Sequence, residues 1–455
     1  MQSSPLALAF ALLLMGTSAI ARTADPAPPP AASATPGTHA VAPAIAGRAG
    51  EVVAIINGGG NVAVTFAASF RAAVADDKLK EVFSQLTEGL GKAESVTVAR
   101  PLDGSTFAAA IIVRFEHGTA EMNLVVAPVA PHQVTGLLVT SAAPSEQARL
   151  NSFDDICKAL AALPGKANFA AIDLAHSDTP LGALNPDTPL ALGSAFKLFV
   201  LAELVREIEA GERSWDDTLV YDGEQLPSGG FAQTPPGTRL GLRALAEKMV
   251  SVSDNSATDL LVRALGPTKI AAMQRTLGIA DPAANEPFLT TLQMFKLKGI
   301  DGGALGRRYL TLDRAGKAKL LAEQVDPAPV SAIGEPFKAN KPIMIDKIEW
   351  FATPRDLARV MAWLDAQGST AAGKEALRIL AINPGPGRAL AGPFAYVGYK
   401  GGSEPGVLNM TLLLKGKAGR RFVVTVGWND TTDNAVSALQ MAMYVERAGQ
   451  LLAGS

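Results

Sequence analysis

The fold is decided by one apolar stretch of the chain, Gly193-Ser194-Ala195-Phe196-Lys197-Leu198-Phe199-Val200-Leu201-Ala202-Glu203-Leu204-Val205. Its hydrophobic side chains cover nearly the whole circumference of a helix, and this pattern predicts a buried central helix. Ser194 and Lys197 stand three residues apart at its start, so on a helix they share one face and the ammonium lies beside the hydroxyl. We therefore expect a candidate nucleophile, Ser194, at the first turn of a core helix.

The composition is that of an ordinary globular chain. Of the 455 residues, 48% are hydrophobic and 18% are charged, so the chain can bury large cores in more than one domain. The formal net charge of −2, with both signs interspersed, predicts no nucleic-acid partner and no polybasic membrane contact. The four histidines show no metal-ligand spacing, so neither a catalytic metal nor another cofactor is predicted. The single cysteine, Cys157, excludes an intrachain disulfide.

Residues 1–21 have the pattern of a secretory signal peptide. An apolar run from Leu6 to Met15 is followed by Ala19-Ile20-Ala21, a small-residue cleavage site, although no Lys or Arg precedes the run. The alternative is a membrane anchor, but about ten apolar residues are too few to span a bilayer. No cysteine follows the run, which excludes a lipoprotein anchor. The sequence predicts a bacterial protein exported to the periplasm or secreted, with no stable membrane anchor after signal cleavage.

Residues 22–48 are rich in Pro, Ala, Thr and Ser and are predicted to form an extended linker. From residue 49 to 143 the pattern changes to helical segments, at Val62–Ala75 and Asp77–Leu90, and then to strands. The predicted strands are Ser95–Arg100, Thr106–Phe115, Thr119–Ala127 and Gln133–Thr140. Helices followed by consecutive antiparallel strands predict a small α+β domain in which a helix lies on a curved sheet. No catalytic spacing of titratable groups occurs here, and the sequence does not identify what this domain binds.

Residues 144–455 are predicted to form a second domain, in which strands framed by helices surround an all-α stretch. Its expected elements include helices at Phe153–Leu163 and from Leu242, strands at Asn168–Leu174, Ala395–Lys400, Val407–Leu414 and Phe422–Val426, and a closing helix at Asn434–Leu452. Gly211 is placed to end the central helix, and Ser256 and Asp259 have the spacing of a capping box. A further helix is expected to begin with Thr353 as its cap and Pro354 at its first position. The pattern indicates an α/β lobe joined to an α lobe.

Three short motifs in this domain carry residues suited to catalysis. They are S-x-x-K at Ser194–Lys197, S-D-N at Ser253–Asn255 and K-G-G at Lys400–Gly402. The first and third are weak alone, whereas S-D-N is a specific triplet. In this order, on a helix start, a helix junction and a strand end, they resemble the serine β-lactamase and penicillin-binding-protein superfamily. The resemblance implies an antiparallel sheet flanked by helices, a nucleophile on the core helix, a second serine on the α lobe and a lysine on an edge strand.

The same residues suffice for acyl transfer on chemical grounds. A serine hydroxyl is a poor nucleophile that needs a base, and Lys197 can serve if it is neutral. Burial and a second cation, Lys400, are the two forces able to lower its pKa. Ser253 then offers a hydroxyl that relays a proton to the leaving group. The backbone N–H groups of Ser194 and Ser403 are predicted to form the oxyanion hole.

Residues beside these groups are expected to contact the substrate. Asn255 is predicted to bind a substrate amide, and Gly401, Gly402 and Ser403 are predicted to line the acyl site. The resemblance implies that Asp254 anchors its loop and does not react. The expected partner is a small-molecule acyl compound, either a β-lactam or another ester or amide.

The base for deacylation is assigned by resemblance. In class A β-lactamases that base is the Glu of an E-x-x-L-N motif, and this chain has Glu286-Pro287-Phe288-Leu289-Thr290, thirty-three residues beyond Ser253. Thr290 keeps a hydrogen-bonding group but lacks the donor and acceptor pair of an amide. The alternative for Glu286 is a solvated loop carboxylate. A second departure is Gly401, which lacks the hydroxyl that would hold a β-lactam carboxylate.

The segment Leu289–Lys347 is longer than a compact class A enzyme needs. With the α+β domain in front, the chain is similar to a two-domain branch that includes the cephalosporin esterase-like protein of clavulanic acid gene clusters. In that branch a steroid-isomerase-like, cystatin-like domain precedes the β-lactamase-like domain. The resemblance implies an exported serine hydrolase with β-lactamase activity. An esterase or amidase, a peptidoglycan peptidase and a receptor that is acylated and never released are the alternatives.

Overall fold

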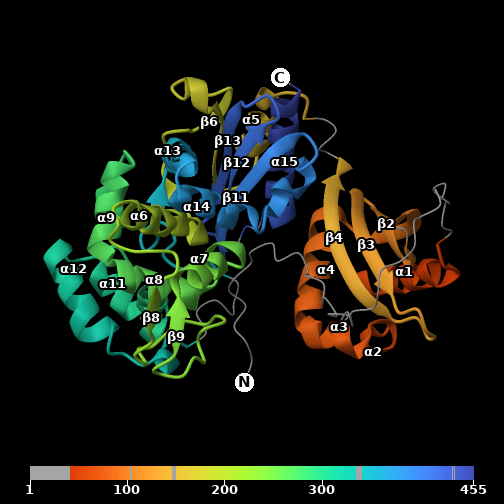
Figure 1. The fold of residues 1–455 in the computed structure, drawn as a ribbon, viewed down its shortest axis with the longest axis horizontal. Helices are drawn as coiled ribbons and strands as arrows, with labels where there is room; N and C mark the ends of the chain where they lie inside the picture. The colour runs from red at the N-terminus through yellow and green to blue at the C-terminus, as the bar shows by residue number, and fades with distance from the viewer. Residues whose placement is uncertain are drawn as a thin grey trace, which may run out of the picture. The chain divides into compact units, whose positions relative to one another are not determined.

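The computed structural model describes residues 41–102, 105–145, 150–334, 341–432, 434 and 436–454. The predicted signal peptide and residues 22–40 of the predicted linker lie outside this part of the chain. The chain forms two compact units, one built mainly from residues up to Arg149 and the other mainly from Leu150 onward (Figure 1). Within the described ranges, no helix is long and apolar enough to cross a membrane.

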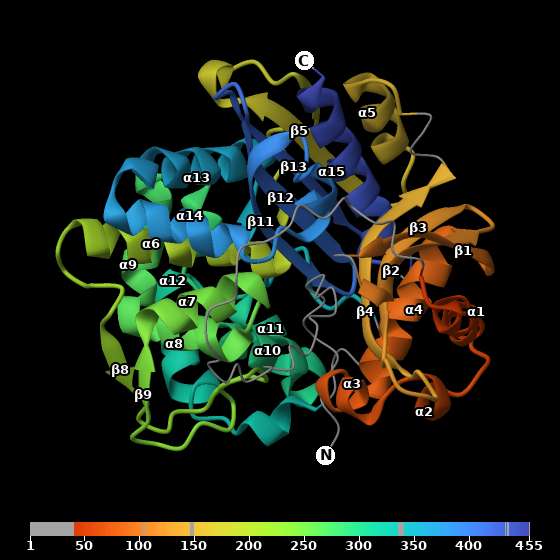
Figure 2. The same ribbon diagram turned by 45° about the vertical axis from the view of Figure 1, so that its right-hand side comes forward.

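The first unit combines short helices with one antiparallel sheet. Its elements are α1 (Pro43–Ile56), α2 (Val62–Thr65), α3 (Ala68–Ala73), α4 (Asp76–Leu90), β1 (Ala93–Leu102), β2 (Ser105–Phe115), β3 (Gly118–Val126) and β4 (Val134–Pro144). The four strands pair in sequence order, as expected for consecutive hairpins. Helices α1 and α4 bury their apolar faces in the same core as the inward-facing side of the sheet (Figure 2). The α+β arrangement and all four strands follow the sequence prediction.

Two boundaries in this unit differ from the sequence prediction. The predicted linker overlaps α1, whose Ile45 and Ala49 are fully buried. Pro43 is compatible with that helix because it stands at the first helical position, where its missing N–H has no partner to lose. The helix predicted over Val62–Ala75 is divided into α2 and α3, because Phe66 is extended and forms a bridge to β4.

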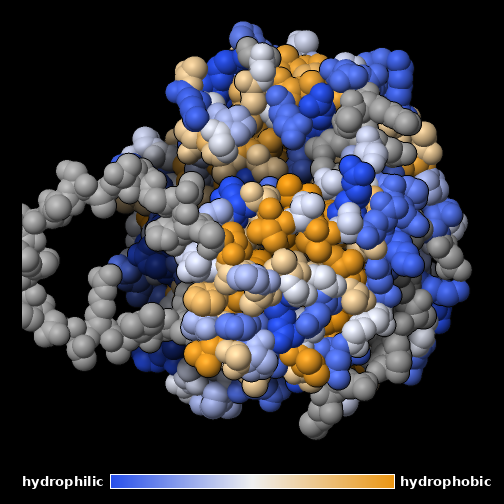
Figure 3. Space-filling view, turned by 90° about the vertical axis from the view of Figure 1, so that its right-hand side faces the viewer, coloured by the Kyte–Doolittle hydropathy of each residue, from blue (hydrophilic) through white to orange (hydrophobic). Residues whose placement is uncertain are grey.

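The surface of this unit mixes apolar and polar residues. Val64, Ile112 and Val129 are its large exposed apolar side chains among the described residues. In Figure 3 apolar residues gather near the centre of the face shown, and polar residues surround them.

The second unit is built on a five-stranded antiparallel sheet. Its strands are β5 (Lys166–Asp173), β6 (Gly182–Leu184), β11 (Phe394–Glu404), β12 (Val407–Gly416) and β13 (Arg421–Asn429), in the spatial order β11-β12-β13-β5-β6. The order makes β11, which carries the K-G-G motif, an edge strand. Short pairs join β7 (Leu190–Ala191) to β10 (Phe351–Ala352) and β8 (Thr218–Val220) to β9 (Arg239–Gly241).

Helices cover both faces of this sheet and continue into an α lobe (Figures 1 and 2). They are α5 (Phe153–Ala161), α6 (Lys197–Glu209), α7 (Leu242–Ser251), α8 (Asn255–Leu265), α9 (Pro267–Thr276), α10 (Thr291–Gly299), α11 (Ala304–Tyr309), α12 (Arg314–Leu320), α13 (Pro354–Ala366), α14 (Ala371–Ala381) and α15 (Ala438–Ala453). Every residue of α6 from Lys197 to Val205 is buried, which confirms the predicted central helix. Gly211 follows it with φ +71°, a conformation that suits glycine.

Helix caps confirm one prediction and correct another. Thr353 and Asp356 form a capping box at the start of α13, with Pro354 at the first turn, as predicted. The box predicted for Ser256 and Asp259 is wrong, because Asp254 caps α8 by accepting from Ala257 N. Asp259 is buried and accepts the backbone N–H groups of Thr291 and Leu292, so it holds the start of α10 instead.

Candidate active site

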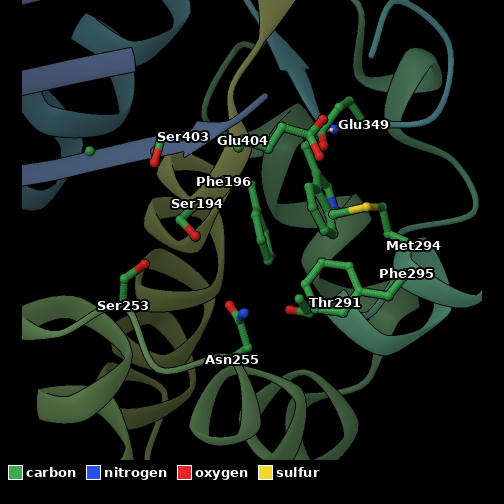
Figure 4. Close-up of a pocket in the computed structure, with 14 residues that line it drawn as sticks. Ser194, Phe196, Ser253, Asn255, Thr291, Met294, Phe295, Glu349, Ser403 and Glu404 are labelled. Carbon is green, nitrogen blue, oxygen red and sulfur yellow. Dashed lines mark hydrogen bonds between the residues drawn. The ribbon is translucent and has the colours of Figure 1, made fainter. Parts of the chain in front are cut away.

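Ser194 lies at the point where the sheet meets the α lobe. It belongs to a short 3-10 turn, η3 (Gly193–Phe196), that leads directly into α6. The turn lines a pocket together with residues of β11, the S-D-N loop and α10. In Figure 4 the hydroxyl groups of Ser194, Ser253 and Ser403 lie along one side of that pocket. The structure therefore brings the three sequence motifs to one site.

The hydroxyl of Ser253 sits between two lysines. Lys197 Nζ donates to Ser253 Oγ at 3.2 Å, and Lys400 Nζ donates to the same atom at 3.0 Å. Ser253 itself has φ +57°, in the left-handed region that few residues other than glycine adopt. Because both donors point at the oxygen, its own proton is free to be donated elsewhere. The geometry suits a hydroxyl that receives a proton on one side and releases one on the other.

Both lysines are buried, and burial changes how readily they hold a proton. Burial lowers the pKa of Lys197 from its ordinary value to about 7. The pKa of Lys400 lies well below its ordinary value, first because of burial and then because of the charge on Lys197. The sequence predicts that both burial and Lys400 lower the pKa of Lys197. In the structure burial is the main cause of the lowered pKa of Lys197. Repulsion between the two cations lowers the pKa of Lys400 instead.

The lowered pKa predicts a specific pH dependence. Lys197 can accept a proton only when it is neutral, so kcat/KM should rise with pH and level off above about pH 7, falling about tenfold per unit below it. The measurement is kcat/KM between about pH 5 and pH 9, with circular dichroism to show that the fold is kept. A rate that stays level from about pH 5 to pH 8 would exclude Lys197 as the base.

Strand β11 passes against the start of the helix. A Cβ atom placed on Gly402 would lie 2.4 Å from Ser194 N and 2.1 Å from Leu192 O. A Cβ atom on Gly193, which has φ +50°, would lie 2.8 Å from Ser403 N. Only glycines allow the two backbones to approach this closely. The approach puts the backbone N–H groups of Ser194 and Ser403 near one another, as an oxyanion hole requires.

This close packing predicts the effect of one methyl group. Gly402→Ala should push the strand away from the helix start and lower kcat/KM by at least about 100-fold, because oxyanion donors act only at hydrogen-bond distance. Gly416→Ala is the matched control, since its added Cβ would meet nothing closer than 3.6 Å. Equal activity of the two variants would show that turnover does not need the close contact between β11 and the start of α6.

Two side chains of the S-D-N loop have different roles: Asn255 lines the pocket and Asp254 holds the loop. Asn255 Oδ1 accepts from Lys197 Nζ at 2.8 Å and the residue lines the pocket, which leaves its amide nitrogen for a substrate. Asp254 Oδ1 accepts from Ala257 N and from Ser256 Oγ, both at 2.7 Å. Asp254 also accepts from Gly230 N. Asp254 is therefore committed to holding the loop.

Glu286 is not brought to the pocket. Its side chain is 3% exposed, and its carboxylate pairs with Arg275 and with Arg314. Thr290, the last residue of its motif, caps α10 and accepts from Gln293 N. The alternative of a solvated carboxylate is wrong, because the group is buried and paired with two arginines. Two arginines occupy the oxygens that a catalytic water would need.

The missing hydroxyl at Gly401 has a structural cause. A Cβ atom on Gly401 would lie 2.0 Å from Tyr399 Oη, so the phenol fills the space that a Ser or Thr side chain would need. Tyr399 is buried, and burial raises the pKa of its phenol. Gly401 and Gly402 still line the pocket through their backbone.

The pocket also contains residues that the sequence analysis missed. They are Phe196, Thr291, Met294, Phe295, Glu349, Trp350 and Glu404. The spacing of Thr291, Met294 and Phe295 is that of one helix face, a signal that could have been used. Glu404 directly follows Ser403, but nothing in the sequence indicates that Glu349 would join it. Among the described residues, no cluster of His, Cys, Asp or Glu could hold a metal ion.

An antiparallel sheet beside an α lobe, with a serine at the start of the helix between them and a lysine on the edge strand, defines the class of β-lactamase-like serine hydrolases. The model of the Beta-lactamase enzyme family matches residues 151–445, which is more than half of the chain. The chain belongs to this family. A search of curated proteins by sequence found no match.

The solved structures that match this chain include two β-lactamases and PBP-A. The β-lactamase from Sphaerobacter thermophilus DSM 20745 is 20% identical, with a TM-score of 0.47 over 67% of this chain and 97% of that chain. PBP-A is 15% identical, with a TM-score of 0.46 over 67% of this chain and 96% of that chain. A β-lactamase from Chitinophaga pinensis DSM 2588 is 17% identical, with a TM-score of 0.45 over 68% of this chain and 98% of that chain.

Proposed function

We propose that this protein is a serine hydrolase that works through an acyl-enzyme on Ser194, with β-lactams as its substrates. The observation that carries the proposal is the placement of Ser253 Oγ, which accepts from both Lys197 and Lys400 beside the nucleophile. Two lysines with lowered pKa values on one hydroxyl make a proton relay that a purely structural site would not need.

These groups support the following order of steps in acylation. Neutral Lys197 accepts the hydroxyl proton of Ser194 while Ser194 Oγ attacks the carbonyl carbon of the substrate. The backbone N–H groups of Ser194 and Ser403 then donate to the oxyanion that forms. The bond between the carbonyl carbon and the leaving nitrogen then breaks. Ser253 donates its proton to that nitrogen and is reprotonated from the lysines. Water later attacks the ester and releases the acid.

The test uses a chromogenic cephalosporin with intact-mass spectrometry on the same samples. We expect steady turnover and no lasting adduct. A permanent adduct of one acyl group would instead identify a receptor. Neither turnover nor an adduct would exclude β-lactams as substrates.

A second candidate is hydrolysis of esters or amides outside the β-lactam class. It is favoured by Gly401, where Tyr399 Oη excludes the hydroxyl that would hold a β-lactam carboxylate. This second candidate would be established if the protein hydrolyses p-nitrophenyl esters but does not hydrolyse the cephalosporin. A peptidoglycan peptidase would instead release D-alanine from a D-alanyl-D-alanine peptide.

The Glu286 carboxylate gives a prediction about deacylation. Because two arginines hold it outside the pocket, Glu286→Gln should lower the Tm by a few degrees and change the deacylation rate by less than about threefold. Stopped-flow acylation and intact-mass spectrometry separate the two steps. Accumulation of an acyl-enzyme in this variant would make Glu286 the base that activates water and would require the arginines to release it.

We also propose that the protein is exported, on the strength of the apolar run and the cleavage pattern at Ala19-Ile20-Ala21. Expression of the full chain with N-terminal sequencing of the mature protein tests this. A mature protein that begins near Arg22 is expected. Retention of residues 1–21 would exclude cleavage.

A further inference from the structure

The wall of the pocket that is formed by Glu349 and Glu404 contains a buried ionic cluster. Lys298 Nζ donates to Glu349 Oε1 at 3.1 Å and to Glu404 Oε1 at 2.5 Å. The side chains of Lys298, Glu349 and Glu404 are 0%, 0% and 4% exposed. Figure 4 shows the two carboxyl groups close together, away from the three serines. Glu404 lies on β11 directly after Ser403, so the cluster is continuous with the acyl site.

The cluster lacks one positive charge. Two carboxyl groups share a single ammonium, and buried charges are normally balanced. Burial and the neighbouring Glu349 raise the pKa of Glu404 well above its ordinary value. Both causes favour the protonated form of Glu404 in the empty pocket, which offsets the missing positive charge.

Two polar atoms on this wall have no hydrogen-bond partner among the residues that the structure describes. They are Glu404 Oε2 and Trp350 Nε1, both buried in residues that line the pocket. Buried polar atoms are almost always paired in folded proteins. An unpaired carboxyl oxygen at a pocket wall indicates a group that a ligand completes.

The remaining surface near the cluster is aromatic. The rings of Phe196 and Trp350 stack with centroids 3.6 Å apart, and Phe295 lines the same pocket. Aromatic faces attract cations, and carboxylates pair with them, so the combination selects a cation over a neutral group. A neutral ligand could accept a hydrogen bond from protonated Glu404. It would bring no positive charge, so the cluster would be unbalanced whenever Glu404 is ionised.

We propose that this wall is a subsite for a protonated amine on the acyl side chain of the substrate. The ammonium takes the place of the proton on Glu404, donates to Glu404 Oε2 and lies against the aromatic rings. The proposal rests on the proposed function, because it assigns the acyl group that reaches Ser194. It makes the enzyme selective for amine-bearing acyl compounds.

Three penicillins that differ at one carbon of the side chain test the subsite. Ampicillin carries an ammonium there, benzylpenicillin a hydrogen and carbenicillin a carboxylate. Dissociation constants are measured by calorimetry on the full-length Ser194→Ala variant, so that binding is read without chemistry. We expect ampicillin to bind at least about tenfold more tightly than benzylpenicillin, and carbenicillin most weakly. Equal affinities, the reverse order or no binding of any of the three would overturn the proposal.

Variants in the same Ser194→Ala background assign the effect to the cluster. Glu404→Gln should reduce the ampicillin preference to about onefold, because an amide resembles the protonated acid and cannot ionise. Glu203→Gln is the matched control, since Glu203 is 1% exposed, pairs with Arg206 and does not line the pocket. Its preference for ampicillin should be unchanged. If Glu404→Gln does not fold, the order of the three penicillins on the Ser194→Ala protein still decides the proposal.

Turnover of the same three compounds by the unmodified protein is a separate measurement. Absence of turnover and of a Ser194 adduct with all three would contradict the proposed function, while an ampicillin preference in binding would still support the subsite. Turnover of all three at equal kcat/KM together with equal affinities would support the proposed function and overturn the subsite.

Discussion

Replacing Ser194 by alanine is expected to lower turnover by at least about 1000-fold and to remove every covalent adduct, because the remaining groups of an acyl-transfer site do little without the nucleophile. Ser194 stands at the start of α6, with Ser253, Lys197 and Lys400 joined by hydrogen bonds beside it. The loss should appear in kcat, since the substrate pocket itself is unchanged. Steady-state kinetics and intact-mass spectrometry measure it.

Ser251→Ala is the matched control for this loss. Ser251 is a buried serine two residues before Ser253, and its Oγ donates to Glu247 O at 2.6 Å outside the pocket. Its removal should change turnover by less than about threefold. If Ser194→Ala retained activity similar to that of Ser251→Ala, the nucleophile would have to be another residue.

Lys197→Arg is expected to abolish acylation, with a loss of at least about 1000-fold, although it keeps a cation in the site. Lys197 Nζ donates to Ser253 O at 2.7 Å and to Asn255 Oδ1 at 2.8 Å, and a guanidinium can supply such donors. A guanidinium is protonated at every accessible pH and cannot accept the serine proton. The expected result separates a base from a structural cation. The measurement is the rate of acyl-enzyme formation by rapid quench.

The same substitution at a second buried lysine provides the control. Lys296 is 1% exposed, and its Nζ donates to Asp326 O at 2.8 Å away from the pocket. Lys296→Arg should keep acylation within about threefold of the unmodified rate. Acylation by Lys197→Arg at a comparable rate would mean that another group takes the proton.

The sequence predicted the elements whose pattern is local. Helix α6 is apolar around its circumference, so its burial could be predicted without knowing its neighbours. The capping box at Thr353 was equally readable, because cap and partner are three residues apart. The cluster of prolines before Pro43 predicts a linker there, although the first turn of a helix accepts one proline.

The site was predictable only as far as the motifs reach. S-x-x-K, S-D-N and K-G-G name the residues that meet around Ser253 Oγ, but the motif containing Glu286 did not reveal that Arg275 and Arg314 hold its carboxylate. The cluster at Lys298 joins residues 51 and 106 positions apart along the chain. Pairings at such distances depend on the tertiary packing of a loop, a helix and a strand end, and no local pattern encodes them.

The central claim is that Ser194 carries the acyl group, and peptide mapping of a trapped adduct tests it most directly. The protein is mixed with a penicillin, quenched in acid within milliseconds to seconds, digested and analysed by tandem mass spectrometry. We expect one acyl group on the peptide that contains Ser194, bound to that serine. An adduct on Ser253 or Ser403, or turnover with no adduct at any time point, would contradict it.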